Sequence, residues 1–404
     1  MPRSSRYTPL LMARRLARCS ILLCACALFA CTTTTRVRET GPVRIGIYGD
    51  LSSSGARDGN DALKGVELRV DEINAAGGIG GRMIELYPID VKQSPTEAVK
   101  AYTTLVQEDG VCAVIGSSVA NAGLAVSPVA DLSKVPLVSL AINDLVTSPD
   151  LKLDHPEQTG TVRPFVFLVQ PSAIQMASAL AAYAAGNFLV TRYATLSDPA
   201  NKMSVMQARA FETTLEKAGK VIAASLSFEG DFAALLPKLR AADVEALYVP
   251  GSLEMNLAVA RAARNAAYQS LILGNQAWAS PLLEQAGVPL TNVWFCAGIS
   301  PDDAGIADMW SKFKTRFDDE PRPASVPGWD AIGLVAAAVR KAGSSNPQRV
   351  RDALEQTLGY KSLTGQIDMD KKTHRPLQLP VAIMRIVNGA YKSVETRYIS
   401  VSAK

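Results

Sequence analysis

The chain has 404 residues, of which 48% are hydrophobic, so it is long enough for two lobes with separate cores. Its formal net charge is +4, but five of its arginines and none of its acids precede residue 31, so the rest carries 37 basic and 38 acidic side chains. This nearly neutral balance, without a basic stripe or interleaved aromatic and basic residues, argues against nucleic-acid binding.

Residues 1–30 have the composition of a signal peptide of lipoprotein type. An apolar run over residues 19–31 is too short to span a bilayer, which needs about 20 apolar residues. Leu28-Phe29-Ala30-Cys31 resembles a lipobox, in which the cysteine is lipidated and becomes the mature N-terminus. We therefore expect a membrane anchor on Cys31, followed by a polar tether over residues 31–42. The preceding arginines are Arg3, Arg6, Arg14, Arg15 and Arg18.

Two alternatives remain for this leader. Leu23-Cys24-Ala25-Cys26 also matches a lipobox loosely, and an ordinary cleaved signal peptide would leave no anchor. If Cys31 is lipidated, Thr32 rather than an aspartate follows it, which resembles outer-membrane sorting in a cell that has an outer membrane.

The predicted fold begins at residue 43. The apolar run over residues 43–47 predicts a buried parallel strand, and residues 50–60 predict a polar loop. A helix follows, because apolar residues recur at helical spacing, and residues 83–89 form the next strand. The helical positions are Leu63, Val66, Val70 and Ile73.

The alternation of strands and helices continues along the chain and predicts two doubly wound parallel α/β lobes. Ser94-Pro95-Thr96-Glu97 is a capping box that predicts the start of another helix. Further helices are predicted over residues 121–132, 172–185, 254–267, 307–317 and 327–342. Further strands are predicted over residues 111–115, 136–140, 189–196, 221–227, 246–250, 270–273, 365–370 and 381–387.

The glycine run over residues 77–81 invites a dinucleotide-binding interpretation. A dinucleotide loop follows a strand and opens a helix, whereas these glycines follow a helix and lead into a strand. The run therefore predicts a turn.

Few residues have catalytic or metal-binding patterns. Cys112 and Cys296 lie in apolar strands and are expected to be buried thiols, although an oxidising compartment would also permit a disulfide. The two histidines, His155 and His374, lie in polar, proline-flanked loops, which predicts surface positions. The chain has no zinc spacing, nucleophile elbow or P-loop, so we expect no cofactor, no metal and no enzyme activity. The chain has many aspartates and glutamates, so the sequence does not exclude a catalytic pair of carboxylates.

Small and polar residues follow four of the predicted strands. In open α/β sheets ligands bind beyond the carboxyl ends of strands, so these positions predict a ligand site. The helix after Ser118 would direct its N-terminal amides at a ligand carboxylate, with serine hydroxyls completing the anion site. Simple capping of the following helices is the alternative. The four segments are residues 116–118, 141–144, 251–252 and 274–276.

The segments LSSSGARDGNDALKG, ELRVDEINAAGGIGGR and ELYPID resemble the opening of type I periplasmic solute-binding proteins, closest to the leucine/isoleucine/valine-binding family of ABC importers. PGWDAIGLVAAAVRKAG and GQIDMD extend the resemblance to the end of the chain. It implies two lobes joined by three hinge crossovers, with residues 43–166 and 300–378 in one lobe and 167–299 and 379–404 in the other. It also implies a monomer that passes a small-molecule ligand from the interlobe cleft to an ABC permease and ATPase.

Several ligand positions depart from the pattern of the amino-acid-binding members. The expected serine is Ala120, with Ser117, Ser118 and Asn121 nearby, and the small residue and threonine after Ala141 are Ile142 and Asn143. Two expected aromatic residues align with Asp58 and Ser252, the expected tyrosine aligns with Lys202, and the acid that pairs with the ligand ammonium aligns with Gln276. The predicted ligand-binding residues are Asp58, Ser117, Ser118, Asn121, Ala141, Asn143, Lys202, Ser252 and Gln276.

These departures change the expected ligand. A desolvated ammonium needs a carboxylate, which a neutral Gln276 only half replaces, so Asp58 or Glu254 would have to supply the charge. Lys202 favours an anion. We expect an amide, an organic acid or a modified amino acid rather than leucine bound in the usual way.

Two functions of different classes follow. The first is an extracytoplasmic, lipid-anchored receptor of an ABC importer, and the second is a sensory or envelope-regulatory lipoprotein of the same fold without a transport role. A hydrolase has no positive support in the sequence.

Overall fold

The computed structural model describes residues 39–53, 56–152, 160–279, 285–287, 290–300 and 302–398. The predicted signal peptide with Cys26 and Cys31, most of the tether and His155 lie outside these residues. Residues 1–40 and 41–404 form separate units, and every helix and strand of the described part belongs to the second unit. Within the described part, no helix combines the length and hydropathy that a bilayer crossing requires.

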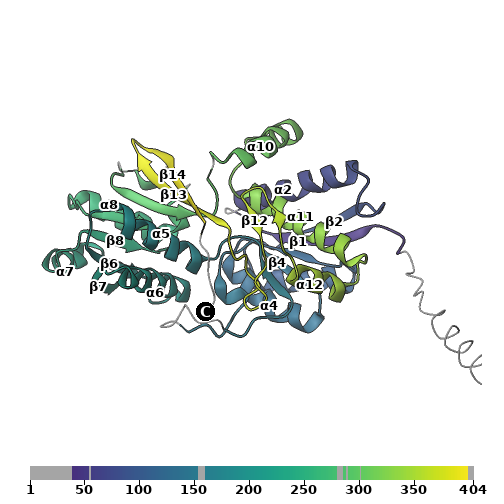
Figure 1. Cartoon of the computed structure of the whole chain (residues 1–404), viewed down its shortest axis with the longest axis horizontal. Coiled ribbons are helices and arrows are strands. Elements are labelled where there is room, and N and C mark those ends of the chain that lie inside the picture. Colours follow the sequence, from purple (N-terminus) through teal and green to yellow (C-terminus); the bar gives the residue numbers. More distant parts are fainter. Residues whose placement is uncertain are drawn as a thin grey trace, which may run out of the picture. The chain divides into compact units, whose positions relative to one another are not determined.

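The first sheet has five parallel strands in the order β2-β1-β3-β4-β5. Helices cover both of its faces, as expected for buried parallel strands. The strands are β1 (Val43–Gly49), β2 (Ile84–Asp90), β3 (Val114–Gly116), β4 (Leu137–Ser139) and β5 (Val166–Leu168). Their apolar side chains form the cores on the two faces. Figure 1 shows the ribbon of this sheet with its helices.

Six helices accompany the first sheet. One face packs against α2 (Ala56–Ala75), α11 (Ser325–Ala342) and α12 (Pro347–Glu355). The other face packs against α3 (Pro95–Gln107) and α4 (Ala120–Ser133). A smaller apolar cluster joins α10 (Ala304–Phe317) to α2 and α11.

The second sheet has seven strands in the order β14-β13-β10-β9-β8-β6-β7. The strands β6 to β10 are parallel, and the C-terminal hairpin of β13 and β14 is antiparallel to them. The strands are β6 (Arg192–Ser197), β7 (Val221–Ser227), β8 (Ala246–Val249), β9 (Leu271–Gly274), β10 (Val293–Ala297), β13 (Pro380–Val387) and β14 (Ala390–Tyr398).

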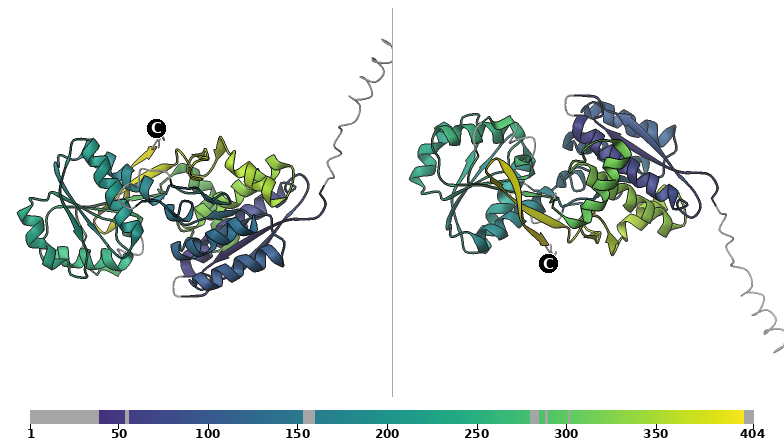
Figure 2. Two further views of the ribbon diagram at one scale, coloured as in Figure 1. Left: turned by 90° about the horizontal axis from the view of Figure 1, so that it is seen from below. Right: turned by 90° about the horizontal axis from the view of Figure 1, so that it is seen from above.

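Helices also cover both faces of the second sheet, as the two views in Figure 2 show. One face packs against α5 (Ala173–Asn187) and α6 (Lys202–Lys217), and the other against α7 (Leu236–Ala241) and α8 (Leu253–Asn265). Three short 3-10 helices, η1 (Asp144–Val146), η2 (Ala233–Leu235) and η3 (Gln276–Trp278), complete the loops.

The chain passes between the two sheet systems at three places. It leaves the first sheet between β5 and α5, returns between β10 and α10, and leaves again after the short hairpin of β11 (Tyr360–Lys361) and β12 (Gln366–Ile367) to form β13. The α/β class and the doubly wound arrangement are thus as predicted. The residue boundaries of the two lobes stay a prediction.

Local sequence signals account for several of these elements. The Oγ atom of Ser94 accepts from the Glu97 amide at 3.2 Å, and Pro95 is the first residue of α3, as the capping box predicts. The run over residues 77–81 is a turn after α2, as predicted. Gly78 has a φ of +74°, and a Cβ there would lie 2.2 Å from the Arg82 carbonyl oxygen, so glycine is required.

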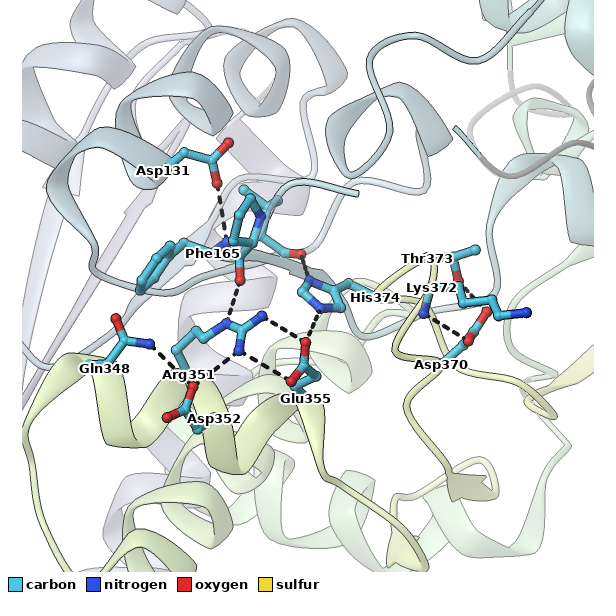
Figure 3. Close-up of polar contacts among 12 residues, drawn as sticks. Asp131, Phe165, Gln348, Arg351, Asp352, Glu355, Asp370, Lys372, Thr373 and His374 are labelled. Carbon is cyan, nitrogen blue, oxygen red and sulfur yellow. Dashed lines mark hydrogen bonds and ion pairs between the residues drawn. The ribbon is translucent and has the colours of Figure 1, made fainter. Parts of the chain in front are cut away.

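Other expectations need correction. The strand predicted over residues 365–370 is only the two residues of β12, and the sequence analysis missed both α12 and β14. His374 is not on the surface: its side chain is 0% exposed, packs against the first sheet and lies beside Glu355 (Figure 3). Cys112 and Cys296 are buried as predicted, and neither forms a disulfide within the described part.

Candidate functional site

A pocket lies at the carboxyl edge of the first sheet. Its floor is apolar and its rim carries two serines, so it combines a dry surface with a few polar groups, as ligand sites do. The strands β1 and β3 and the start of α2 position these side chains. The lining residues are Ile47, Tyr48, Gly49, Leu51, Gly59, Ala62, Leu63, Ser117, Ser118 and Leu140.

The N-terminus of α4 begins beside the two serines of this pocket. Its N-cap residue, Val119, offers no side-chain acceptor, and Ser117 Oγ accepts from the Val119 amide at 3.0 Å. The first-turn amides of a helix have no intrahelical acceptor and carry the positive end of the helix dipole. An anion site at Ser117 and Ser118 stays a prediction, and these amides are the donors that such a site would use.

Tyr48 adds a polar group that the sequence analysis missed. Tyr48 is among the lining residues, its side chain is 1% exposed, and its hydroxyl is buried beside the Ser117 backbone. Burial raises the pKa of Tyr48 well above its usual value, so the hydroxyl stays protonated.

The remaining predicted residues of this half lie around the same edge. Ser118 and Asn121 are exposed at the start of α4, and Asp58 is exposed in the first turn of α2. Ala141 is buried and donates its amide to Ser139 Oγ at 3.2 Å. Asn143 is also buried, and its Oδ1 atom accepts from the Leu145 amide at 2.9 Å, so it caps η1.

The predicted residues of the second sheet follow β6, β8 and β9. Lys202 is exposed at the first position of α6. Ser252 caps α8, because its Oγ atom accepts from the Met255 amide at 3.3 Å. Gln276 opens η3, and its Oε1 atom accepts from the Gly298 amide at 3.2 Å. The Ser252 oxygen thus caps its own helix, and the Gln276 oxygen joins the loop after β9 to the segment after β10.

Two carboxylates near the pocket are likewise engaged within the protein. Asp50 is 2% exposed and accepts from Ser53 Oγ at 2.5 Å, and Asp90 accepts from the Leu51 amide at 2.9 Å. Burial tends to raise the pKa of Asp50, but hydrogen bonds from Ser53 and Gln93 outweigh it and hold the pKa below its usual value. These ionised groups hold the loop after β1 in place.

The arrangement favours binding over chemistry. The uncapped amides of α4 and two serines are donors for a carboxylate, and they lie beside apolar side chains. Among the described residues, no group of three or more histidine, cysteine, aspartate or glutamate side chains could hold a metal ion.

The pocket residues that the sequence did not predict are Tyr48 and the apolar lining. Tyr48 directly follows Ile47 in a buried strand, so its side chain points to the opposite face of the sheet. The sequence shows this alternation but not which residues line a pocket. Leu51 lies in the predicted loop and Leu63 in the predicted helix, and only the fold brings them to one pocket.

Comparison with known proteins gives the family. A family model described as periplasmic binding protein matches residues 42–390. The leucine-, isoleucine-, valine-, threonine- and alanine-binding protein of Pseudomonas aeruginosa is 26% identical over 384 residues, which cover 89% of this chain and 94% of that protein.

Solved structures agree with the family match. The branched-chain amino acid transporter substrate-binding protein LivJ from Streptococcus pneumoniae, in complex with isoleucine, superposes with a TM-score of 0.73 at 25% identity, covering 89% of this chain and 99% of that one. A solute-binding protein from Rhodopseudomonas palustris in complex with 3,4-dihydroxybenzoic acid has the same fold, with a TM-score of 0.70 at 18% identity and coverage of 90% and 98%. The chain therefore belongs to the periplasmic binding protein family, whose members are extracytoplasmic solute-binding proteins.

Proposed function

We propose that this chain is the solute receptor of an ABC importer and binds a small carboxylate-bearing ligand at the pocket of the first sheet. The observation that carries the proposal is the N-terminus of α4, which has no side-chain cap and begins beside Ser117 and Ser118 at the pocket. No reaction is catalysed. Binding shifts an equilibrium between conformations, and the liganded form engages the permease and ATPase.

The proposed ligand is amino-acid-like, an amide or an organic acid. The Pseudomonas relative is named for amino acids, and the Rhodopseudomonas structure holds an aromatic acid; both kinds of ligand carry a carboxylate on a compact body. Gln276 is neutral and its Oε1 atom already accepts from the Gly298 amide, so it only half replaces a carboxylate as the partner of an ammonium. Ligands without an ammonium are therefore favoured over leucine.

The remaining predicted ligand residues are part of this proposal. Asp58, Asn121, Ala141 and Asn143 would contact the ligand from the loops and helix starts of the first sheet, and Lys202, Ser252 and Gln276 would contact it from the second sheet. Lys202, which is exposed, would favour a second negative group.

We also propose that the mature chain is a monomer anchored to the envelope through lipid on Cys31. The lipobox-like sequence supports the anchor. Labelling with radioactive palmitate tests it: incorporation should be lost in Cys31→Ser and kept in Cys26→Ser. Incorporation that persists in Cys31→Ser would rule this anchor out.

Ligand binding can be tested directly. Native mass spectrometry of the purified protein should reveal a co-purified small molecule, and a thermal-shift screen should include leucine, benzoate, aliphatic acids and amides. A carboxylate should raise the melting temperature more than its amide does, because only the carboxylate fully uses the α4 amides.

Ala120→Pro is the sharpest variant for this site. Proline is tolerated at the first helical position, and Val119 before it has the extended backbone that proline requires, so the change removes one amide donor without breaking α4. We expect affinity for the best carboxylate to fall by about 10-fold or more. Asn346→Ala, which removes the cap of α12 away from the pocket, should leave affinity unchanged. Equal affinity of Ala120→Pro and the parent chain would exclude the α4 site.

A sensory or envelope-regulatory lipoprotein is the second candidate. Asn143, Ser252 and Gln276 each accept a backbone hydrogen bond within the protein, which leaves less of their capacity for a solute and favours this alternative. If no compound raises the melting temperature and native mass spectrometry detects no co-purified ligand, this alternative is supported over transport.

A further inference from the structure

The first two turns of α2 form one wall of the pocket. Gly59, Ala62 and Leu63 recur at helical spacing and line the pocket together with Ser117 and Ser118. The two serines lie just before α4, so the distance between the starts of α2 and α4 sets the width of the pocket. Whatever holds the start of α2 therefore also influences which ligands fit.

The same part of α2 carries a buried carboxylate. Asp61 is 0% exposed, and Arg322 binds it through two groups: Nε donates to Oδ2, and Nη2 lies 2.6 Å from Oδ1. No other described residue forms a hydrogen bond or ion pair with the Asp61 side chain. A buried charge needs such a partner, so the ionised Asp61 depends on Arg322.

This arginine belongs to residues 319–325, a segment that joins α10 to α11 and that we call the brace. On one side of the arginine, Asp319 Oδ2 lies 2.6 Å from Nζ of Lys64. On the other side, the Ser325 carbonyl oxygen approaches Gly65 so closely that a Cβ on this glycine would lie 2.0 Å from it. The brace thus contacts α2 at three neighbouring positions.

The brace and the pocket lie on opposite sides of the start of α2. With about 3.6 residues per turn, positions 61, 64 and 65 share one face of the helix, and positions 59, 62 and 63 share the face about half a turn away. The brace therefore supports this wall of the pocket from behind. Loss of its ion pair would free the first two turns of α2 to move relative to the two serines.

Another ion pair joins a later turn of α2 to α10, which lies beside it (Figure 1). Nε of Arg316 lies 2.8 Å from Oδ2 of Asp71, and 53% and 52% of the two side chains are exposed. Pairs as exposed as this one contribute little to stability. Arg322 differs from Arg316, because its loss leaves a carboxylate that is buried.

We propose that Arg322 is a positioning residue for the ligand site. Through Asp61 it holds the first two turns of α2 against the brace, and this fixes the distance from that wall to Ser117 and Ser118. Arg322 is not among the residues that line the pocket, so it acts through the helix and not by touching the ligand. The role in binding rests on the proposed ligand site, whereas the position of the wall is measurable without a ligand.

A thiol at position 62 of the full chain tests the position of the wall. Ala62 is 5% exposed and lines the pocket, so the thiol introduced by Ala62→Cys should react with iodoacetamide mainly when the start of α2 opens locally. The part of its labelling rate that does not change at low urea concentrations measures this local opening, whereas the labelling of buried Cys112 follows unfolding of the whole protein. In this background, Arg322→Leu should raise the urea-independent rate by about 10-fold or more.

Three further variants complete the labelling experiment. Arg316→Leu breaks the exposed pair on the same helix and should leave the urea-independent rate unchanged. Arg322→Lys keeps the cation but not the two fixed donors, so its rate should fall between those of Arg322→Leu and the parent. Asp61→Asn breaks the ion pair without leaving a buried charge, so it should fold even if Arg322→Leu does not, and it should also label faster than the parent. Equal urea-independent rates in the parent and in both Asp61→Asn and Arg322→Leu would overturn the proposal.

Binding of leucine and benzoate separates the role of Arg322 from the ligand site itself. Whichever compound binds the parent chain should bind Arg322→Leu about 10-fold more weakly or worse, and Arg316→Leu with the parent affinity. Faster labelling of Arg322→Leu together with parent affinity would show that the wall moves without affecting binding, which also overturns the proposal. If neither compound binds the parent chain, the proposed ligand site loses support, and the labelling rates alone decide whether Arg322 positions the wall.

Discussion

The NH1 atom of Arg375 lies 2.7 Å from Oδ1 of Asp144, and Asp144 is fully buried. The same guanidinium donates to Thr147 Oγ1 and Ser148 Oγ, both at 3.0 Å, while Oδ2 of Asp144 accepts from the Ile174 amide in the first turn of α5 at 3.2 Å. One ion pair therefore joins the loop after β4, the third connection and the start of α5. Its charges are satisfied by hydrogen bonds, as buried charges must be.

Loss of Arg375 should be costly. Arg375→Leu leaves the Asp144 carboxylate buried without its cation, so we expect the free energy of unfolding to fall by about 3–5 kcal/mol in urea titrations. Lys100→Ala is the control, because Lys100 and Glu97 form an exposed pair with 66% and 49% of their side chains accessible. That change should have no measurable effect. Similar losses for the two variants would contradict the role of the buried pair.

The contact of α2 with α11 depends on glycine. A Cβ on Gly65 would lie 2.0 Å from the Ser325 carbonyl oxygen, so Gly65→Ala should destabilise the protein by about 2 kcal/mol or more despite the better helix propensity of alanine. Gly186 lies in α5, and a Cβ there meets nothing within 4 Å. Gly186→Ala should therefore raise stability by about 0.5 kcal/mol. Thermal unfolding should show a lower melting temperature for Gly65→Ala and a higher one for Gly186→Ala than for the parent chain.

Asp330 makes the stability of the protein depend on pH. It is 4% exposed and accepts from the Leu363 amide at 2.9 Å, and burial raises its pKa to about 7. Because the carboxyl pKa is raised in the folded state, the stabilisation from protonated Asp330 is fully present below the unfolded-state pKa of about 4. It is lost as the pH rises toward 7, and the free energy of unfolding falls by up to about 1.4 kcal/mol per pH unit.

Asp330→Asn tests this contribution. The amide keeps a carbonyl oxygen for Leu363 but cannot ionise. Relative to the parent chain, the variant should gain stability as the pH rises from about 4 to 7 and hold that gain above it. Parallel pH profiles for the two proteins would show that Asp330 is not the titrating group.

The reactivity of the two thiols should show whether they are buried in the cores of the folded protein. Cys112 and Cys296 are both buried, and burial raises the pKa of Cys296 to about 12. Neither thiol should react with iodoacetamide at pH 8 in the native protein, and both should react after unfolding, because the thiolate is the reactive form. Peptide mapping by mass spectrometry distinguishes them from the four cysteines of the leader. Rapid native labelling of Cys296 would contradict its burial.

The candidate site was predictable in part. Ser117 and Ser118 follow a buried strand and precede a helix, so strand-end reasoning placed them at the edge of the sheet, where they border the pocket. Asn143 and Ser252 have the same local pattern, but their oxygens cap η1 and α8. Capping and ligand binding use the same residue types at the same positions, so local sequence alone does not separate them.

By itself, the sequence determined the alternation of strands and helices, the start of α3 at Ser94 and the turn at Gly78, because periodicity, capping and backbone sterics act over a few neighbouring residues. Only the tertiary structure decided that Tyr48 reaches a pocket, that Gln276 bonds Gly298, and that His374 leaves its polar loop for a buried place between Phe167 and Glu355. Those outcomes depend on contacts between residues distant in the chain, and burial outweighs local polarity once such contacts satisfy the groups that are buried.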